Sequence, residues 1–261
     1  MSAKKSVRFV SNPVVWIVIV AIIGAGVLIA LNWISSRPPQ PAAPETATAP
    51  APPPAQEQPQ PPAEPAQTPS TVVENIPEQP TKGVADAPVT IEEFAEFYCP
   101  YCARHLFQTF PKIDAEYIQN GLVKYVFHNL IVHGAVAQLA AQAGECAHAQ
   151  GHFWEYHDRL FYAIFEEGKG QLDAEGLKAI AKELGLNEET FASCLESDWA
   201  KAEVEKDRQI LRELLAQVPE SEKPSSIGTP LFFINGRPLV GAWPYERFKA
   251  MIDAELAKQG K

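Results

Sequence analysis

The hydrophobic and polar positions after residue 82 predict alternating strands and helices. Residues 89–97 are rich in β-branched and aromatic side chains and predict a buried strand, and residues 122–130 predict a second strand. The residues between them, 103–120, are expected to form a helix that bends at Pro111. The first part of the domain is therefore expected to run strand, helix, strand.

The pattern becomes helical over residues 135–217. One stretch repeats apolar residues at helical spacing, with Asp173 placed to cap its start and Gly185 to end it: Leu177, Ile180, Ala181 and Leu184. This part of the chain therefore predicts an all-helical region between two sets of strands.

A β-hairpin and a last helix are predicted near the C-terminal end. Residues 230–234 and 239–240 indicate two strands, and Asn235-Gly236 between them is typical of a two-residue hairpin turn. Pro244 then favours the start of a helix.

Residues 14–34 are apolar apart from Asn32 and predict a single transmembrane anchor. As a helix the segment extends about 32 Å, enough for the hydrocarbon core of a bilayer, and Trp16 and Trp33 stand near its ends, as interfacial aromatic residues do. The basic residues of segment 1–13 place it in the cytoplasm and the later residues on the periplasmic or extracellular side. A cleaved signal peptide is the alternative, but its apolar region is usually shorter.

Residues 35–81 contain 15 of the 24 prolines and almost no large apolar side chains. Such a segment cannot bury enough surface to fold, so we expect a disordered tether. The remaining residues, 82–261, suffice for one packed domain.

The charge and cysteine content of residues 82–261 limit the function. This part carries 18 Lys and Arg against 27 Asp and Glu, a net charge of −9, and has no basic stripe, which argues against nucleic acid as a partner. All four cysteines lie here, and an even number outside a membrane fits an oxidising compartment. No metal, nucleotide or haem site is evident, so no cofactor is expected, and nothing requires more than a monomer.

Cys99 and Cys102 stand two residues apart where the first strand gives way to a helix. Pro100 suits the first helical position, which makes Cys99 the N-cap. The free N–H groups of Tyr101 and Cys102 then point at the Cys99 sulfur. Hydrogen bonds to a charged group contribute roughly 1.5–3 kcal/mol each, so they should stabilise the thiolate more than the helix dipole does. We expect a redox-active disulfide in which Cys99 is the nucleophile and Cys102 the buried resolving thiol.

Metal binding is the alternative for the same cysteines. His105 could supply a third ligand beside Cys99 and Cys102, as in a metallochaperone that delivers copper, but no second ligand pair follows. Without a metal, His105 is expected on the surface of the helix. A third reading is a tethered interaction module whose cysteines are incidental.

Motifs spread over residues 83–258 resemble the DsbA-like thiol:disulfide oxidoreductases. They follow one another at fitting spacing: Ala87-Pro88-Val89-Thr90-Ile91, Glu93-Phe94, Cys99-Pro100-Tyr101-Cys102, Glu145-Cys146-Ala147, Gln150-Gly151-His152-Phe153-Trp154, Gly228-Thr229-Pro230 and Phe233-Ile234-Asn235-Gly236. The resemblance implies a thioredoxin-like α/β fold with an inserted all-helical domain at about 135–218.

The resemblance also implies roles for residues outside the cysteine pair. Pro230 corresponds to the cis-proline of the family, which presents Thr229 as an edge for substrate peptide, beside Pro100 and Tyr101. Glu93 corresponds to a buried acid under the active site, with a raised pKa that lets it take a proton from the resolving thiol.

Two further predictions concern the exposure of two glutamates near Glu93 and the pairing of the remaining two cysteines. Strand alternation predicts that Glu92 and Glu96 face solvent. Cys146 and Cys194 both fall in the helical insertion and are interpreted as a structural disulfide. Two inert buried thiols, or a second redox pair, are the alternatives for these cysteines.

Together with the anchor predicted for residues 14–34, the resemblance implies a membrane-tethered oxidoreductase that donates disulfides to unfolded or newly exported proteins. A membrane redox partner would then recharge its cysteine pair. Tyr101 stands where the strongly oxidising members carry histidine, and Pro-Tyr with a threonine before the cis-proline also resembles disulfide isomerases. The direction of electron flow, as oxidase, isomerase or reductase, therefore stays open at this point.

Overall fold

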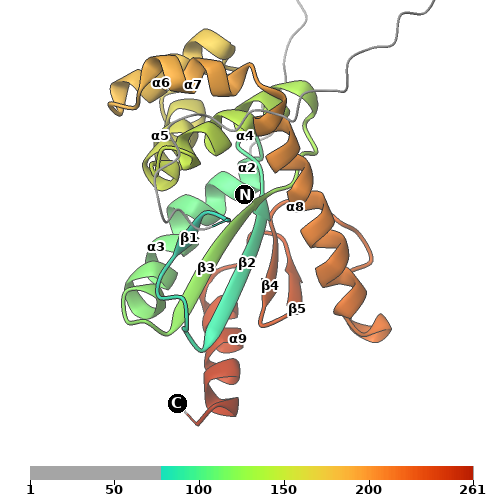
Figure 1. The fold of residues 1–261 in the computed structure, drawn as a ribbon. Helices are drawn as coiled ribbons and strands as arrows, with labels where there is room; N and C mark the ends of the chain where they lie inside the picture. Colours follow the sequence, from blue (N-terminus) through green and yellow to red (C-terminus); the bar gives the residue numbers. More distant parts are fainter. Residues whose placement is uncertain (1–77, 261) are drawn as a thin grey trace, which may run out of the picture. The chain divides into compact units, whose positions relative to one another are not determined.

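The computed structural model describes residues 78–260, which form a five-stranded sheet with helices on both faces (Figure 1). The strand order is β1-β3-β2-β4-β5, and only the central pair, β2 with β3, is parallel. The strands are β1 (Thr81–Lys82), β2 (Val89–Ala95), β3 (Val123–Asn129), β4 (Leu231–Ile234) and β5 (Arg237–Val240).

Each face of the sheet buries its own apolar cluster. On one face the helices that follow β2 pack together with α9 (Tyr245–Lys258), and the cluster includes Ile91, Ile113, Phe232, Phe248 and Ile252. On the other face α8 (Asp198–Gln217) packs on β3, and the cluster includes Phe94, Leu130, Leu211, Leu231 and Phe233. Because both faces are covered, strand alternation does not separate buried residues from exposed ones in this sheet.

The helical insertion lies beyond the end of the sheet where β2 and β3 finish (Figure 1). Its helices are α4 (Gly134–His148), α5 (Phe153–Phe165), α6 (Ala174–Glu183), α7 (Glu188–Leu195) and the first part of α8. The predicted signals at α6 are confirmed, since the Asp173 side chain accepts a hydrogen bond from the Gly176 N–H and Gly185 has φ +77°. The helical region, predicted over 135–217, is confirmed nearly to the residue.

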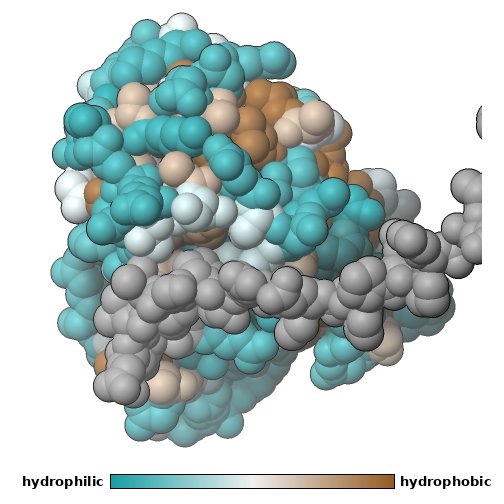
Figure 2. Space-filling model, turned by 45° about the horizontal axis from the view of Figure 1, so that its top comes forward, coloured by the Kyte–Doolittle hydropathy of each residue, from teal (hydrophilic) through white to brown (hydrophobic). Residues whose placement is uncertain are grey.

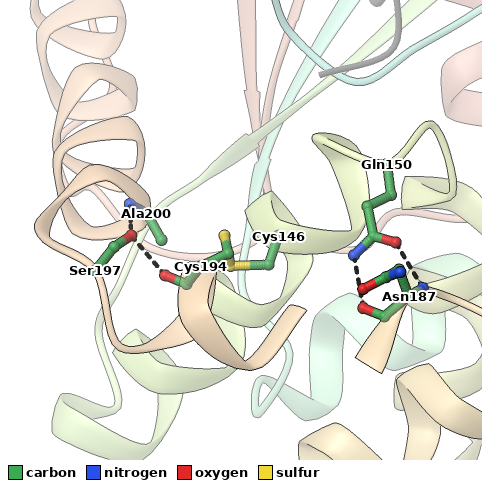
Figure 3. The surroundings of a disulfide bond; sticks show 6 residues. All are labelled: Cys146, Gln150, Asn187, Cys194, Ser197 and Ala200. Carbon is green, nitrogen blue, oxygen red and sulfur yellow. Dashed lines mark hydrogen bonds between the residues drawn. A yellow bond between two sulfur atoms is a disulfide. The ribbon is translucent and has the colours of Figure 1, made fainter. Parts of the chain in front are cut away.

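A disulfide joins two helices of the insertion. Cys146 on α4 and Cys194 on α7 are bonded, with their Cα atoms 5.7 Å apart, which confirms the predicted pairing (Figure 3). On one side of this bond the Ser197 hydroxyl donates to the Cys194 carbonyl at 2.6 Å. On the other side Gln150 and Asn187 exchange two hydrogen bonds, of 2.8 and 3.4 Å (Figure 3). The crosslink and the two bonds between Gln150 and Asn187 hold the ends of α4 and α7 together.

The helix after β2 differs from the prediction. It begins at Pro100 and consists of α2 (Pro100–Arg104), the π-helical segment η1 (His105–Thr109), α3 (Phe110–Ile113) and a second π-helical segment, η2 (Asp114–Ile118). Instead of a simple bend at Pro111, a wider turn precedes this proline, which lies in the first turn of α3. Proline has no N–H to donate, so an interruption of the helical hydrogen bonds just before it is favourable.

The hairpin is confirmed and one strand was missed. Asn235 and Gly236 have φ values of 46° and 79°, which suit the predicted two-residue turn between β4 and β5. β1 has only two residues and therefore no readable pattern, and it starts at Thr81, inside the predicted tether 35–81. The tether boundary drawn from proline content thus falls within the sheet.

The surface of the described part is mainly hydrophilic, with a hydrophobic area in the upper right of the view (Figure 2). The large apolar side chains with substantial exposure are Val84, Tyr101, Phe107, Val132, Tyr162, Ile227 and Trp243. Within residues 78–260 no helix is both long and apolar enough to cross a bilayer. The expected cytoplasmic segment 1–13, the anchor 14–34 and nearly all of the tether lie outside the described residues.

Candidate active site

Cys99 and Cys102 lie where β2 gives way to α2, as predicted. Cys99 is the N-cap of α2 with extended backbone angles, and Pro100 occupies the first turn. Both thiols are free, and both are buried, with 2% and 1% of their surface exposed. The structure therefore presents a reduced pair at the N-terminus of a helix.

The surroundings of Cys99 favour its thiolate. A hydrogen bond with the Cys102 thiol is the largest cause, and it helps to lower the pKa of Cys99 from 9.0 to about 6. Burial opposes this shift, whereas the Thr229 side chain and the backbone N–H groups of Cys102 and Tyr101 lower the pKa further. The amides lower the pKa in the predicted direction, but they are the smallest of its causes, and Cys99 makes no side-chain cap hydrogen bond to them. The sequence did not indicate that the neighbouring thiol would be the stronger stabiliser.

Cys102 has the opposite chemistry. Its burial raises its pKa well above 9.0, and the hydrogen bond to Cys99 and the charges of Cys99 and Glu93 raise it further. Near neutral pH this sulfur therefore holds its proton while its partner loses one. This difference in pKa makes Cys99 the anion of the reduced pair, and it means that Cys102 must take up a proton when the disulfide is reduced.

Thr229 and Pro230 face this pair from the loop before β4. The Thr229–Pro230 peptide bond is cis, which confirms the prediction for Pro230. The Cys99 thiol donates to the Thr229 carbonyl, with the sulfur 3.3 Å from the oxygen. Tyr101, the other expected substrate contact, is 56% exposed. The residues predicted for substrate binding therefore surround Cys99.

Glu93 is buried beneath the pair, as predicted. It is 5% exposed, and burial raises its pKa from 4.5 to about 7, although a hydrogen bond from the Tyr125 hydroxyl, at 2.7 Å, acts against this rise. The charge of Cys99 also raises the pKa of Glu93. Tyr125 was not identified from the sequence, where it stands among the apolar residues of β3.

The prediction that Glu92 and Glu96 face solvent is wrong for Glu96 and only partly right for Glu92. Glu96 follows β2 and is fully buried, and its carboxylate accepts from the backbone N–H groups of Val132 and His133, at 2.8 and 3.1 Å, and contacts the His133 ring. Glu92 is 23% exposed and pairs with the His128 ring on the face that α8 covers. Helices and loops on both faces explain why alternation fails here.

The prediction of a surface position for His105 is also wrong. His105 is 1% exposed, and its Nε2 lies 3.0 Å from the Tyr125 hydroxyl. Among residues 78–260, no three His, Cys, Asp or Glu side chains are arranged to hold a metal ion. The geometry therefore does not assemble Cys99, Cys102 and His105 into the copper site that the alternative required.

A small cavity connects the acid to the resolving cysteine. Its walls include Glu93, Cys102, His105 and His157, and its volume is about 10 Å³, close to the smallest space that holds one water molecule. The carboxyl, the thiol and the two imidazoles thus share one enclosed space.

A second buried polar group lies on the opposite face of the sheet. Asp207 of α8 is 1% exposed and accepts from the Asn129 N–H at 2.7 Å and the Asn129 side-chain amide at 3.0 Å. It also contacts His128 Nδ1 at 3.2 Å, and Asn129 donates to Glu145 at 2.7 Å. This network joins the sheet to α4 and α8, and no local sequence pattern indicates it.

A nucleophilic thiolate, a protonated partner thiol and a buried acid beneath them suit the exchange of a dithiol with a disulfide. On a thioredoxin-type sheet, this site defines the class as thiol:disulfide oxidoreductase. The chain belongs to the thioredoxin family, because the family model described as thioredoxin matches residues 75–254.

Individual relatives agree with this class. The chain is 30% identical over 181 residues to disulfide bond formation protein D of Bacillus subtilis, which covers 68% of this chain and 77% of the relative. It superposes on the crystal structure of oxidised BdbD from Bacillus subtilis with a TM-score of 0.57 and 29% identity, covering 69% of this chain and 94% of that one.

The chain also matches part of larger proteins described as sodium/proton antiporters. The chain is 32% identical over 178 residues to Na(+)/H(+) antiporter NhaA 3 of Salinispora tropica, which covers 67% of this chain but only 24% of that protein. The similarity is therefore to a quarter of the antiporter's length.

Proposed function

We propose that the protein is a membrane-tethered oxidoreductase that donates disulfides to exported proteins through Cys99 and Cys102. The observation that carries this proposal is the contrast between the two sulfurs, with the pKa of Cys99 lowered to about 6 and that of Cys102 raised. A disulfide donor needs a reduced form that is stabilised, and a stable Cys99 thiolate stabilises it.

The reaction follows from the positions of the two sulfurs. A substrate thiolate attacks Cys99 Sγ of the oxidised enzyme, the Cys99–Cys102 bond breaks, and Cys102 leaves with the electron pair and takes up a proton. A second substrate thiolate then attacks the substrate sulfur of this mixed disulfide and releases Cys99 as a thiolate. The substrate dithiol is oxidised to a disulfide, and the enzyme disulfide is reduced to a thiol and a thiolate.

Thr229 is the proposed contact for the substrate backbone. Its carbonyl lies 3.3 Å from Cys99 Sγ, so a peptide bound along this edge would bring its own sulfur to the nucleophile. Pro100 and Tyr101 lie beside the same sulfur, and the exposed Tyr101 ring offers an apolar surface to an unfolded chain.

The reduction potential of the Cys99–Cys102 pair tests the direction of transfer. A pKa lowered from 9.0 to about 6 stabilises the reduced form at pH 7 by about 1.4 kcal/mol, or ~30 mV for a two-electron couple. We expect a value between about −270 mV, that of thioredoxin, and about −120 mV, that of DsbA. Equilibration with glutathione buffers, followed by alkylation and mass spectrometry, measures this potential.

A potential at or below that of thioredoxin would contradict the donor role and favour a reductase. The matched control is the Tyr101→His variant, which places a cation between the cysteines. Its potential should be less negative than that of the wild type, because the added charge stabilises the Cys99 thiolate further.

The proposed location rests on residues 14–34 and on the relatives. A single apolar segment preceded by basic residues supports an anchor with the catalytic domain on the periplasmic or extracellular side. The name of the Bacillus relative, disulfide bond formation protein D, supports exported proteins with cysteines as clients. A membrane partner would reoxidise the pair, and the protein would act as a monomer.

Two measurements on membranes test this arrangement. The full chain should stay with the membrane fraction after a high-salt wash, and protease added to the outer side should digest the domain. Release by salt, or protection of the domain in intact cells, would refute the arrangement.

A further inference from the structure

The hydrogen bonds beneath Cys102 form a directed chain of three side chains. The Tyr125 hydroxyl donates to Glu93 Oε2 at 2.7 Å and lies 3.0 Å from His105 Nε2. A tyrosine has one O–H, so its oxygen must accept the second bond, and His105 must carry its proton on Nε2. The chain therefore runs from the His105 N–H to the Tyr125 O–H and from there to the Glu93 carboxylate.

The structure holds His105 in this neutral, singly protonated form. Burial lowers the pKa of His105 from 6.5 to about 3, so the ring is neutral near pH 7. Its Nδ1 atom is buried and has no hydrogen-bond partner among the described residues. His105 is also the first residue of the π-helical segment η1, a kind of segment that often occurs at functional sites. A buried ring with one unpaired nitrogen is costly for the fold, which points to a use for the paired one.

Glu93, the last member of this series of hydrogen bonds, lies near the Cys102 sulfur, which needs a proton. Glu93, Cys102 and His105 line the same cavity of about 10 Å³, which is about the space of one water molecule, and the charge of Glu93 acts on the Cys102 thiol. The other ionisable residue of the lining is His157 on α5, and the charge of Cys99 also acts on Glu93. Lys82 of β1 lies over the rings of Phe110 and Trp154, which line the same cavity.

We propose that Tyr125 and His105 are positioning residues that set the protonation of Glu93 and so control proton transfer to Cys102. The inference rests on the proposed function for the role of Cys102. When the Cys99–Cys102 bond breaks, the carboxylic acid of Glu93 gives its proton to the Cys102 sulfur and becomes a carboxylate. The Tyr125 O–H, oriented by the His105 N–H, stabilises that carboxylate, and the proton returns to Glu93 when the disulfide forms again.

The test is the titration of Glu93 in the reduced protein, followed by NMR of carboxyl-labelled glutamate. The variant Glu93→Gln identifies the resonance. In Tyr125→Phe the midpoint should move about one pH unit or more to higher pH, because a hydrogen bond to the carboxylate is lost. In His105→Leu the Glu93 midpoint should move in the same direction by about half as much. In His105→Gln, which keeps an N–H donor, the midpoint should return to the wild-type value.

Two internal controls separate this role from a general disturbance. Glu145 has a pKa raised by burial to about 8, contacts Asn129, and should titrate unchanged in every variant. Tyr156→Phe removes a buried hydroxyl that donates to the Leu177 carbonyl in the insertion, and it should leave Glu93 unmoved.

An unmoved Glu93 midpoint in Tyr125→Phe, or equal movement of Glu93 and Glu145, would overturn the inference. Should Tyr125→Phe fail to fold, the pair His105→Leu and His105→Gln decides, since equal midpoints in these two would also overturn it. The titration needs no exchange activity, so its failure is distinct from failure of the proposed function.

Discussion

Replacement of Cys99 by serine should abolish disulfide exchange, with a loss of about 10³-fold or more in the rate of oxidation of a reduced, unfolded protein. A hydroxyl cannot form the mixed disulfide, and Cys102 cannot substitute, because its pKa is raised well above 9.0 and it keeps its proton near neutral pH. The measurement is oxidative refolding of a reduced protein by the preoxidised enzyme, followed by alkylation of the remaining thiols.

The matched control for Cys99→Ser is the double variant Cys146→Ser, Cys194→Ser. It removes the other two cysteines, which form the disulfide of the insertion, and should keep exchange activity. If Cys99→Ser retained wild-type activity, or if the double variant lost all activity while remaining folded, Cys99 would not be the nucleophile.

Replacement of Asp207 by alanine should destabilise the fold by about 3–5 kcal/mol, the usual cost of removing one partner of a buried ion pair. The Asp207 carboxylate accepts two bonds from Asn129 and contacts His128, and all three residues are buried. Without it, a cationic ring and a backbone N–H stay buried with fewer partners. Urea unfolding of the oxidised protein, followed by tryptophan fluorescence, measures the change.

The Asp207→Ala effect should also depend on pH. Burial lowers the pKa of His128, but hydrogen bonds to Asp207 and Glu92 outweigh burial and raise it from 6.5 to about 9. A raised pKa contributes stability that is complete below pH 6.5 and is lost as the pH rises through about 9. The difference between the wild type and Asp207→Ala should therefore shrink above pH 9.

Glu205→Ala is the control on the same helix. Glu205 is exposed, and its contact with Arg208 is 3.7 Å long, so its loss should change the free energy of unfolding by less than about 0.5 kcal/mol. A cost for Asp207→Ala no larger than that of Glu205→Ala would show that the buried network does not hold α8 on the sheet.

Features that depend on a few adjacent residues were predictable from the sequence. Cys99 is the N-cap of α2 because Pro100 follows it, and Asn235-Gly236 forms the hairpin turn because both residues tolerate positive φ. The side chain of Asp173 caps α6 for a similarly local reason. In each case the physical cause lies within one turn of the residue itself.

Features that depend on contacts between distant segments were not predictable. Glu96 is buried by the loop that carries Val132 and His133, more than thirty residues later in the chain. His105 and Tyr125 meet only because the helix after β2 packs over β3. Strand alternation and helix periodicity describe one element at a time and carry no record of such pairings.

The same limit applies to the strength of the active-site interactions. The sequence indicated that the amides of α2 would stabilise the Cys99 thiolate, and they do lower its pKa. The larger contribution comes from the Cys102 thiol, and the Thr229 side chain adds to it from a loop 130 residues away. These contributions depend on side-chain geometry, which the spacing of two cysteines does not specify.

Titration of Cys99 in the reduced protein, followed by the ultraviolet absorbance of the thiolate, tests directly whether the fold holds this sulfur as an anion; Cys99→Ser is the blank. We expect a single midpoint near 6 that the blank lacks, because the site lowers the pKa of Cys99 to about 6. A midpoint near 9.0, the ordinary value, would contradict the claim that the fold holds this sulfur as an anion.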